Sequence, residues 1–176
     1  MRTATFALFA GIAYFSAGLL GLIPDALTPP PADAPVTRVT ALYGYLLGLF
    51  PVNAPHSAVH VAIGLWGLVA WQADHVGQRV RSPRLFARTI ALLYGALALL
   101  GLFPGLNTLF GVLPIHGHDV WLHGGTALVA AYFGWRPLVE VERRRLETPD
   151  RREHPEPVPH ERRYGHGDRR IPASEV

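Results

Sequence analysis

The sequence predicts an all-α integral membrane protein, a bundle of four transmembrane helices made of two parallel helical-hairpin repeats. Composition is the first reason, because 49% of the 176 residues are hydrophobic and only 16% are charged. The second reason is that residues 4–24, 39–73 and 89–118 contain no Lys, Arg, Asp or Glu. Long uncharged stretches of this kind are typical of membrane proteins. The third reason is an internal repeat.

Four segments are long enough to cross a bilayer. A hydrocarbon core of about 30 Å takes about 20 helical residues, with a range of roughly 17–25. The segments are residues 4–23, 56–72, 85–103 and 119–135. Together they predict a transmembrane domain over residues 1–136. The first segment is expected to be a retained span and not a cleaved signal peptide, because its apolar run is too long.

Arginine distribution predicts the orientation of these spans. Fourteen of the sixteen arginines precede the first span, lie between the second and third, or follow the fourth; Arg88 lies at the same side, near the start of the third span, and only Arg38 lies on the other side. The positive-inside rule therefore puts both termini and the 72–85 loop in the cytoplasm. Trp71 and Trp135 then fall at the inner interface and Trp121 near the outer one, as in an aromatic belt. The predicted localisation is the bacterial plasma membrane, as a multi-pass protein.

The two halves of the chain match each other in order. An offset of 80 residues places Phe6, Tyr14, Gly21 and Pro24 on Phe86, Tyr94, Gly101 and Pro104. An offset of 63 places Gly48, Pro51, His60 and Leu65 on Gly111, Pro114, His123 and Leu128. Each half reads as a span, a proline, a short apolar segment, a proline and a histidine-bearing span. Two spans per half preserve orientation, so the repeats are predicted to be parallel.

The segments outside the spans are of two kinds. The short apolar segments 42–50 and 106–113 cannot cross a bilayer, so we expect them to be interfacial or re-entrant on the outer face. Residues 137–176 are rich in Pro and in charges of both signs, which predicts a cytoplasmic, mostly disordered tail. Within it, Arg143, Arg144 and Arg145 form a basic patch that is predicted to face lipid.

Histidines at the start of the second and fourth spans are the candidate site. His56 and His60 lie four residues apart and therefore point the same way on a helix, and His123 corresponds to His60 in the repeat. Small residues follow on the same face, which indicates the interior side of the bundle. Asp119 takes the place of His56 in the second half and fits a helix N-cap. His116 and His118 lie in the adjoining loop.

Three interpretations of these side chains remain open. Imidazoles with one carboxylate suit zinc, copper or iron, and two facing histidines suit haem. Histidine also titrates near neutrality, which would suit a proton or pH sensor. In the third interpretation each imidazole bonds a carbonyl or neighbouring side chain and joins two helices.

Other chemistry finds little support in the sequence. The chain has no cysteine, so neither a disulfide nor a thiolate metal site is expected. No nucleophile with a neighbouring base and no phosphate-binding glycine loop is visible, and we expect no enzymatic activity. The pI near 9.7 invites a nucleic-acid interpretation, but ten Arg face nine Asp or Glu in residues 136–176, which argues against nucleic acid as a partner.

The sequence resembles a known family through two motifs. These are the run "PVNAPHSAVH" at residues 51–60 and the run "DVWLH" at residues 119–123. Both are similar to motifs of the bacterial four-span membrane proteins grouped as domain of unknown function 4383, and the resemblance covers roughly residues 5–136. It implies a four-helix integral membrane protein and no particular activity, substrate or cofactor.

Three functions follow as hypotheses. The leading one is a small non-enzymatic membrane protein, structural or accessory, without a cofactor, whose partners are the lipid bilayer and a membrane protein or further copies of itself. The alternative is a metal- or haem-binding membrane protein in which His60 and His123 are central and His56, His116, His118 and Asp119 are further ligands. The third is a small transporter or channel, which the scarcity of polar side chains in the spans disfavours.

Overall fold

The computed structural model describes residues 2–76 and 82–137. Its main elements are four α-helices, accompanied by a short 3-10 helix and a small three-stranded sheet. In chain order the elements are α1 (Thr3–Leu20), η1 (Pro24–Ala26), β1 (Leu27–Thr28), β2 (Gly44–Leu46), β3 (Phe50–Val52), α2 (Ala54–Val76), α3 (Pro83–Gly101) and α4 (His118–Trp135). The basic run Arg143–Arg145 lies outside the described residues.

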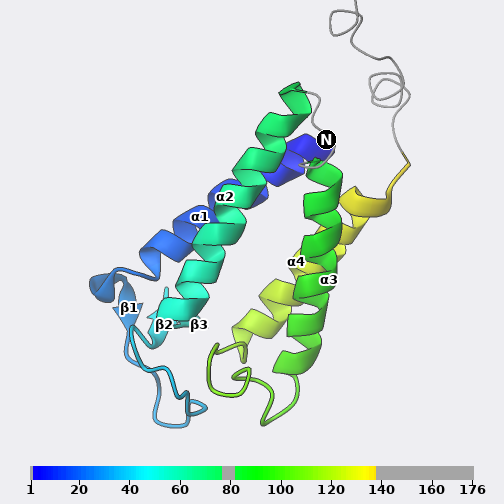
Figure 1. Ribbon diagram of the computed structural model, residues 1–176. Helices are drawn as coiled ribbons and strands as arrows, with labels where there is room; N and C mark the ends of the chain where they lie inside the picture. Colours follow the sequence, from blue (N-terminus) through cyan, green and yellow to red (C-terminus); the bar gives the residue numbers. More distant parts are fainter. Residues whose placement is uncertain (1, 77–81, 138–176) are drawn as a thin grey trace, which may run out of the picture. The chain divides into compact units, whose positions relative to one another are not determined.

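The helices are arranged as two pairs. α1 packs along α2 and α3 packs along α4, as Figure 1 shows, while contacts between the two pairs are less extensive. The sheet and the connection from α3 to α4 lie at the same end of the helices, and the N-terminus lies at the other end. This end with the sheet also carries the starts of α2 and α4, so it is where the predicted site residues enter the helices.

Glycine allows the close approach of α1 and α2. A Cβ atom at Gly67 would lie 2.8 Å from Gly11 Cα and 2.9 Å from the Ala7 carbonyl oxygen, both of which belong to α1. A Cβ atom at Gly11 would in turn lie 2.8 Å from the Leu68 backbone nitrogen. Small residues at a helix interface let two backbones approach in this way. The face of α2 that carries His60 and Gly67 was predicted to lie inside the bundle, and at Gly67 it meets α1.

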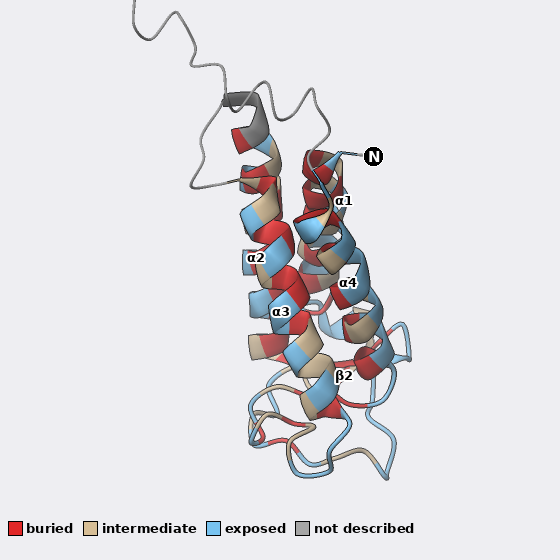
Figure 2. Ribbon diagram, turned by 90° about the vertical axis from the view of Figure 1, so that its right-hand side faces the viewer, coloured by how far each residue is buried: buried red, intermediate tan, exposed pale blue. Residues whose placement is uncertain are grey.

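The core lies between the four helices and is built of aromatic and small side chains. Phe6 stacks on Phe133 with ring centroids 5.1 Å apart, and Trp66 meets Phe86 edge-on at 5.2 Å. Figure 2 shows buried positions recurring along the helix sides that face the other helices, with exposed positions on the outer sides. Edge-on and stacked rings of this kind add to the stabilisation that burial itself provides.

Two of the described helices, α1 and α3, are long and apolar enough to cross a membrane. The sequence predicts four such spans. α2 and α4 are as long, but His56, His60, Asp119 and His123 lower their apolar character, because these side chains are more polar than the aliphatic ones around them.

The short apolar segments take forms that the sequence did not indicate. The first contains an antiparallel hairpin, in which β2 pairs with β3 and Tyr45 lies opposite Pro51. Its turn holds Leu47 and Gly48 at positive φ, a conformation that is costly for leucine. In the second segment Leu109, Phe110 and Gly111 also have positive φ and form successive turns.

Candidate metal site

Three imidazole rings converge between α2 and α4. His56 and His60 come from α2 and are four residues apart, which places them on one face of that helix. His123 comes from α4 and meets them from the opposite side. Each ring contributes one nitrogen to a set of three in which every pair lies within 4.8 Å. All three residues are buried. The helical spacing of the first two was evident from the sequence, and their meeting with His123 is a tertiary contact.

The rings pack closely on one another. His56 and His60 meet edge-on with centroids 4.5 Å apart, and His56 and His123 lie 6.1 Å apart at a tilt. Within the described residues, His60 Nδ1 and both ring nitrogens of His123 are buried without a hydrogen-bond partner. A buried polar atom that lacks a partner costs free energy, and so each of these nitrogens requires an explanation.

Two tyrosines, from α1 and α3, cover the histidines from the inner side of the bundle. Tyr14 contacts His60 with ring centroids 5.4 Å apart, and Tyr94 meets His123 edge-on at 4.8 Å. The two tyrosine rings lie 5.1 Å apart and their hydroxyls are hydrogen-bonded to each other. Their place in the site was not predicted from the sequence, although their equivalence in the 80-residue offset was a usable signal.

Asp119 lies beside the three histidines. Its Oδ2 is 3.8 Å from His56 Nε2, and both side chains are almost fully buried. The prediction that Asp119 is the N-cap of its helix was wrong: Gly117 is the N-cap, and Asp119 belongs to the first turn of α4. The reason is that helical geometry begins at His118, two residues earlier than an N-cap at Asp119 would require. The carboxylate therefore points into the protein, where among the described residues Oδ2 has no hydrogen-bond partner.

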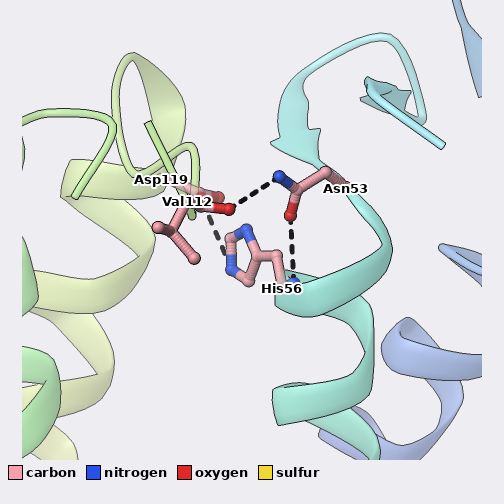
Figure 3. A network of polar contacts seen from close by, with 4 residues as sticks. All are labelled: Asn53, His56, Val112 and Asp119. Carbon is pink, nitrogen blue, oxygen red and sulfur yellow. Dashed lines mark hydrogen bonds and ion pairs between the residues drawn. The ribbon is translucent and has the colours of Figure 1, made fainter. Parts of the chain in front are cut away.

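Asn53 positions the start of α2, as Figure 3 shows. Its Oδ1 accepts a hydrogen bond from the His56 backbone nitrogen at 3.0 Å, which caps the helix. Its Nδ2 donates to the Val39 carbonyl at 3.1 Å and to the Val112 carbonyl at 2.8 Å. Asn53 thus ties the helix that carries His56 to the connection that leads into α4. From the sequence, Asn53 stood out only as part of the motif at residues 51–60.

The two remaining candidate ligands lie apart from this group. His116 packs against Tyr45 with ring centroids 6.3 Å apart, and His118 packs against Phe50 at 6.5 Å and is exposed. Burial lowers the pKa of His116 below its ordinary value of 6.5, because the charged imidazolium loses hydration there. Neither residue joins the group of His56, His60 and His123.

The arrangement has the chemistry of a transition-metal site. Neutral imidazole suits zinc, copper, iron and nickel. Three converging rings suit a single ion better than haem, whose axial ligands lie on opposite faces of a large planar group. We name the set of His56, His60 and His123 the histidine triad.

The comparisons with known proteins give a family and no closer relative. Residues 4–136 match the model of one protein family, described as domain of unknown function (DUF4383). No curated protein and no solved structure matches the chain.

Proposed function

The chain belongs to the DUF4383 family, and from the geometry of the site within the matched region we propose that it is a membrane protein that binds a transition-metal ion through the histidine triad. The observation that carries this proposal is the position of three buried imidazole nitrogens within 4.8 Å of one another. In a tetrahedral site with metal–nitrogen bonds of about 2.0–2.1 Å, ligand nitrogens lie roughly 3.3 Å apart. Small side-chain rotations would close the triad to that spacing.

Metal binding explains the burial of the triad better than a purely structural role does. If the imidazoles served only to join helices, their nitrogens would be expected to hydrogen-bond to carbonyls or side chains. The nitrogens of His60 and His123 that lack a hydrogen-bond partner argue against that role. Each buried polar atom without a partner lowers the folding stability by about 1–3 kcal/mol. A bound ion would satisfy one nitrogen of each ring.

We also propose that all four helices cross the membrane. Large apolar side chains are exposed on the outer sides of α3 and α4, including Leu92 at 68%, Leu128 at 76% and Tyr132 at 64%. Lipid tails would cover such a surface, whereas water would not favour it. The arginine distribution then supports cytoplasmic termini in a plasma-membrane protein.

The proposal of two parallel repeats is supported by pairs of equivalent residues that face each other. Phe6 and Phe86 lie 6.2 Å apart and Tyr14 and Tyr94 lie 5.1 Å apart. Residues related by a twofold axis approach each other near that axis, so these contacts are those expected of a pseudo-twofold pair of hairpins. The histidine triad lies where the two repeats meet.

Elemental analysis of the protein purified in detergent tests metal binding. We expect close to one zinc, copper, iron or nickel ion per chain, and loss of that ion in the His60→Ala, His123→Ala double variant. The matched control is His118→Ala, which removes an exposed histidine and is expected to keep the ion. A wild-type protein that stays metal-free after incubation with each ion and removal of the excess would refute the proposal.

Cysteine accessibility tests the orientation, because the chain has no cysteine of its own. A single Val36→Cys variant places a thiol at a position that is 89% exposed, in the outer connection. A single Ser174→Cys variant places one in the C-terminal tail. In intact cells an impermeant maleimide is expected to label the first and not the second. The reverse pattern, or labelling of both, would contradict the proposed orientation.

A further inference from the structure

The histidine triad by itself supplies three ligands and no negative charge. A divalent ion held by three neutral imidazoles would keep its full charge in a buried site, and an isolated buried charge is very costly. Either a protein carboxylate or a small anion from solvent must therefore complete the coordination. The first case gives a closed site of four protein ligands, and the second leaves one position open for exchange.

Asp119 is the acidic side chain placed beside the triad. Its Oδ2 lies 3.8 Å from His56 Nε2. This distance is too long for a hydrogen bond, whose usual range is about 2.7–3.2 Å. It is close to the edge of a metal-ligand tetrahedron, about 3.3 Å for bonds of about 2.0 Å. The spacing of these two atoms suits two ligands of one ion. The Asp119 carboxylate is outside the group of atoms that all lie within 4.8 Å of one another, so its side chain must rotate further toward the triad to complete the site.

The surroundings of both atoms agree with this placement. Asp119 is 1% exposed, and within the described part of the chain its Oδ2 has no hydrogen-bond partner. In Figure 3 the His56 ring extends from α2 toward α4 and Asp119 lies on the facing side.

We propose that Asp119 is the fourth ligand of the metal ion, so that His56, His60, His123 and Asp119 form a closed tetrahedral site between α2 and α4. This inference rests on the proposed metal binding. Its consequence is that the ion is held as a structural element joining the two helix pairs, because no coordination position is left for a substrate. The carboxylate supplies one of the two negative charges that would neutralise a divalent ion.

Cobalt(II) is the probe for this site, because its visible absorption reports coordination number and exchange of ligands. We expect the wild-type protein to bind one Co(II) with the intense absorption of a tetrahedral site, and the spectrum to stay unchanged when azide is added. In the Asp119→Asn variant we expect Co(II) to bind more weakly by at least tenfold and the spectrum to shift with azide, because one position is then open. Asp25→Asn, on an exposed carboxylate, is the matched control and should behave as wild type.

Each outcome decides between the proposals. No Co(II) binding by the wild type would refute the metal site as a whole. Co(II) binding with an azide-dependent spectrum in the wild type would keep the metal site and overturn Asp119 as a ligand. Equal affinity in wild type and Asp119→Asn would overturn it too. The azide titration of the wild type needs no variant, so the test stands even if Asp119→Asn does not fold.

Discussion

Gly67→Ala tests whether α1 and α2 depend on direct backbone contact. Gly67 lies on α2 opposite Gly11, and the added methyl would lie 2.8 Å from Gly11 Cα and 2.9 Å from the Ala7 carbonyl oxygen. Both are backbone atoms of a neighbouring helix, which cannot move aside as a flexible side chain does. The variant must therefore push the two helices apart.

The expected cost follows from these distances. Carbon atoms in favourable contact lie about 3.5–4.0 Å apart, so the helices must separate by at least roughly 0.7 Å, the difference between 3.5 Å and 2.8 Å. Overpacking of this kind costs about 1–3 kcal/mol. Alanine regains about 0.5–1 kcal/mol through its higher helix propensity. The net loss of unfolding free energy is therefore about 1 kcal/mol, within a range of roughly 0–2.5 kcal/mol.

Thermal unfolding in detergent measures this loss, and the chain provides a matched control. Gly125 also lies within a helix, but a Cβ there meets no atom within 4 Å, so Gly125→Ala has only the propensity effect. We expect Gly67→Ala to lower Tm by a few degrees and Gly125→Ala to raise it slightly, since about 1 kcal/mol corresponds to roughly 2–4 °C in a chain of this size. Equal shifts of the same sign in both variants would refute the close-contact argument.

Three further predictions concern the loops, the core and pH. Asn53→Ala removes a helix cap and the donor of hydrogen bonds to two carbonyls, so it should lower the unfolding free energy measured by urea titration by about 2–4 kcal/mol. A loss of about 1 kcal/mol or less, the typical effect of a cap alone, would contradict this. Phe133→Ala should cost about 3–5 kcal/mol in the same assay, whereas Trp121→Ala, at a position 76% exposed, should cost far less. Burial lowers the pKa of His116, so the unfolded chain binds more protons than the folded one below pH 6.5. Stability should then fall as the pH drops from 6.5 toward the folded pKa, and His116→Asn should flatten the fall measured by Tm; an unchanged pH profile would contradict it.

Local patterns in the sequence predicted the elements and part of the site. The apolar segments became helices, with starts and ends shifted by a few residues, because their lengths and composition leave the backbone groups little alternative to internal hydrogen bonds. The four-residue spacing of His56 and His60 placed both on one face, because helical periodicity is a local property. The small residues that follow them indicated the side of the next helix for the same reason.

Tertiary structure decided which histidines meet. His123 was the central candidate by sequence and His116 and His118 were further ones, and of these three only His123 reaches the two histidines of α2. His116 and His118 are directed elsewhere by the turns of the 102–117 connection, whose course depends on three successive residues at positive φ. Such a conformation is set by contacts distant in sequence, since only one of the three residues is a glycine.

The same distinction holds for Asp119 and the tyrosines. Sequence alone identified Asp119 as the counterpart of His56 in the repeat, but its position within the first turn of α4 depends on where the preceding loop lets the helix begin. Tyr14 and Tyr94 were visible as equivalent positions, yet their contact with the histidines arises only when the two helix pairs pack together. Periodicity determines which residues share a face of a helix, whereas the packing of separate helices determines which faces form a site.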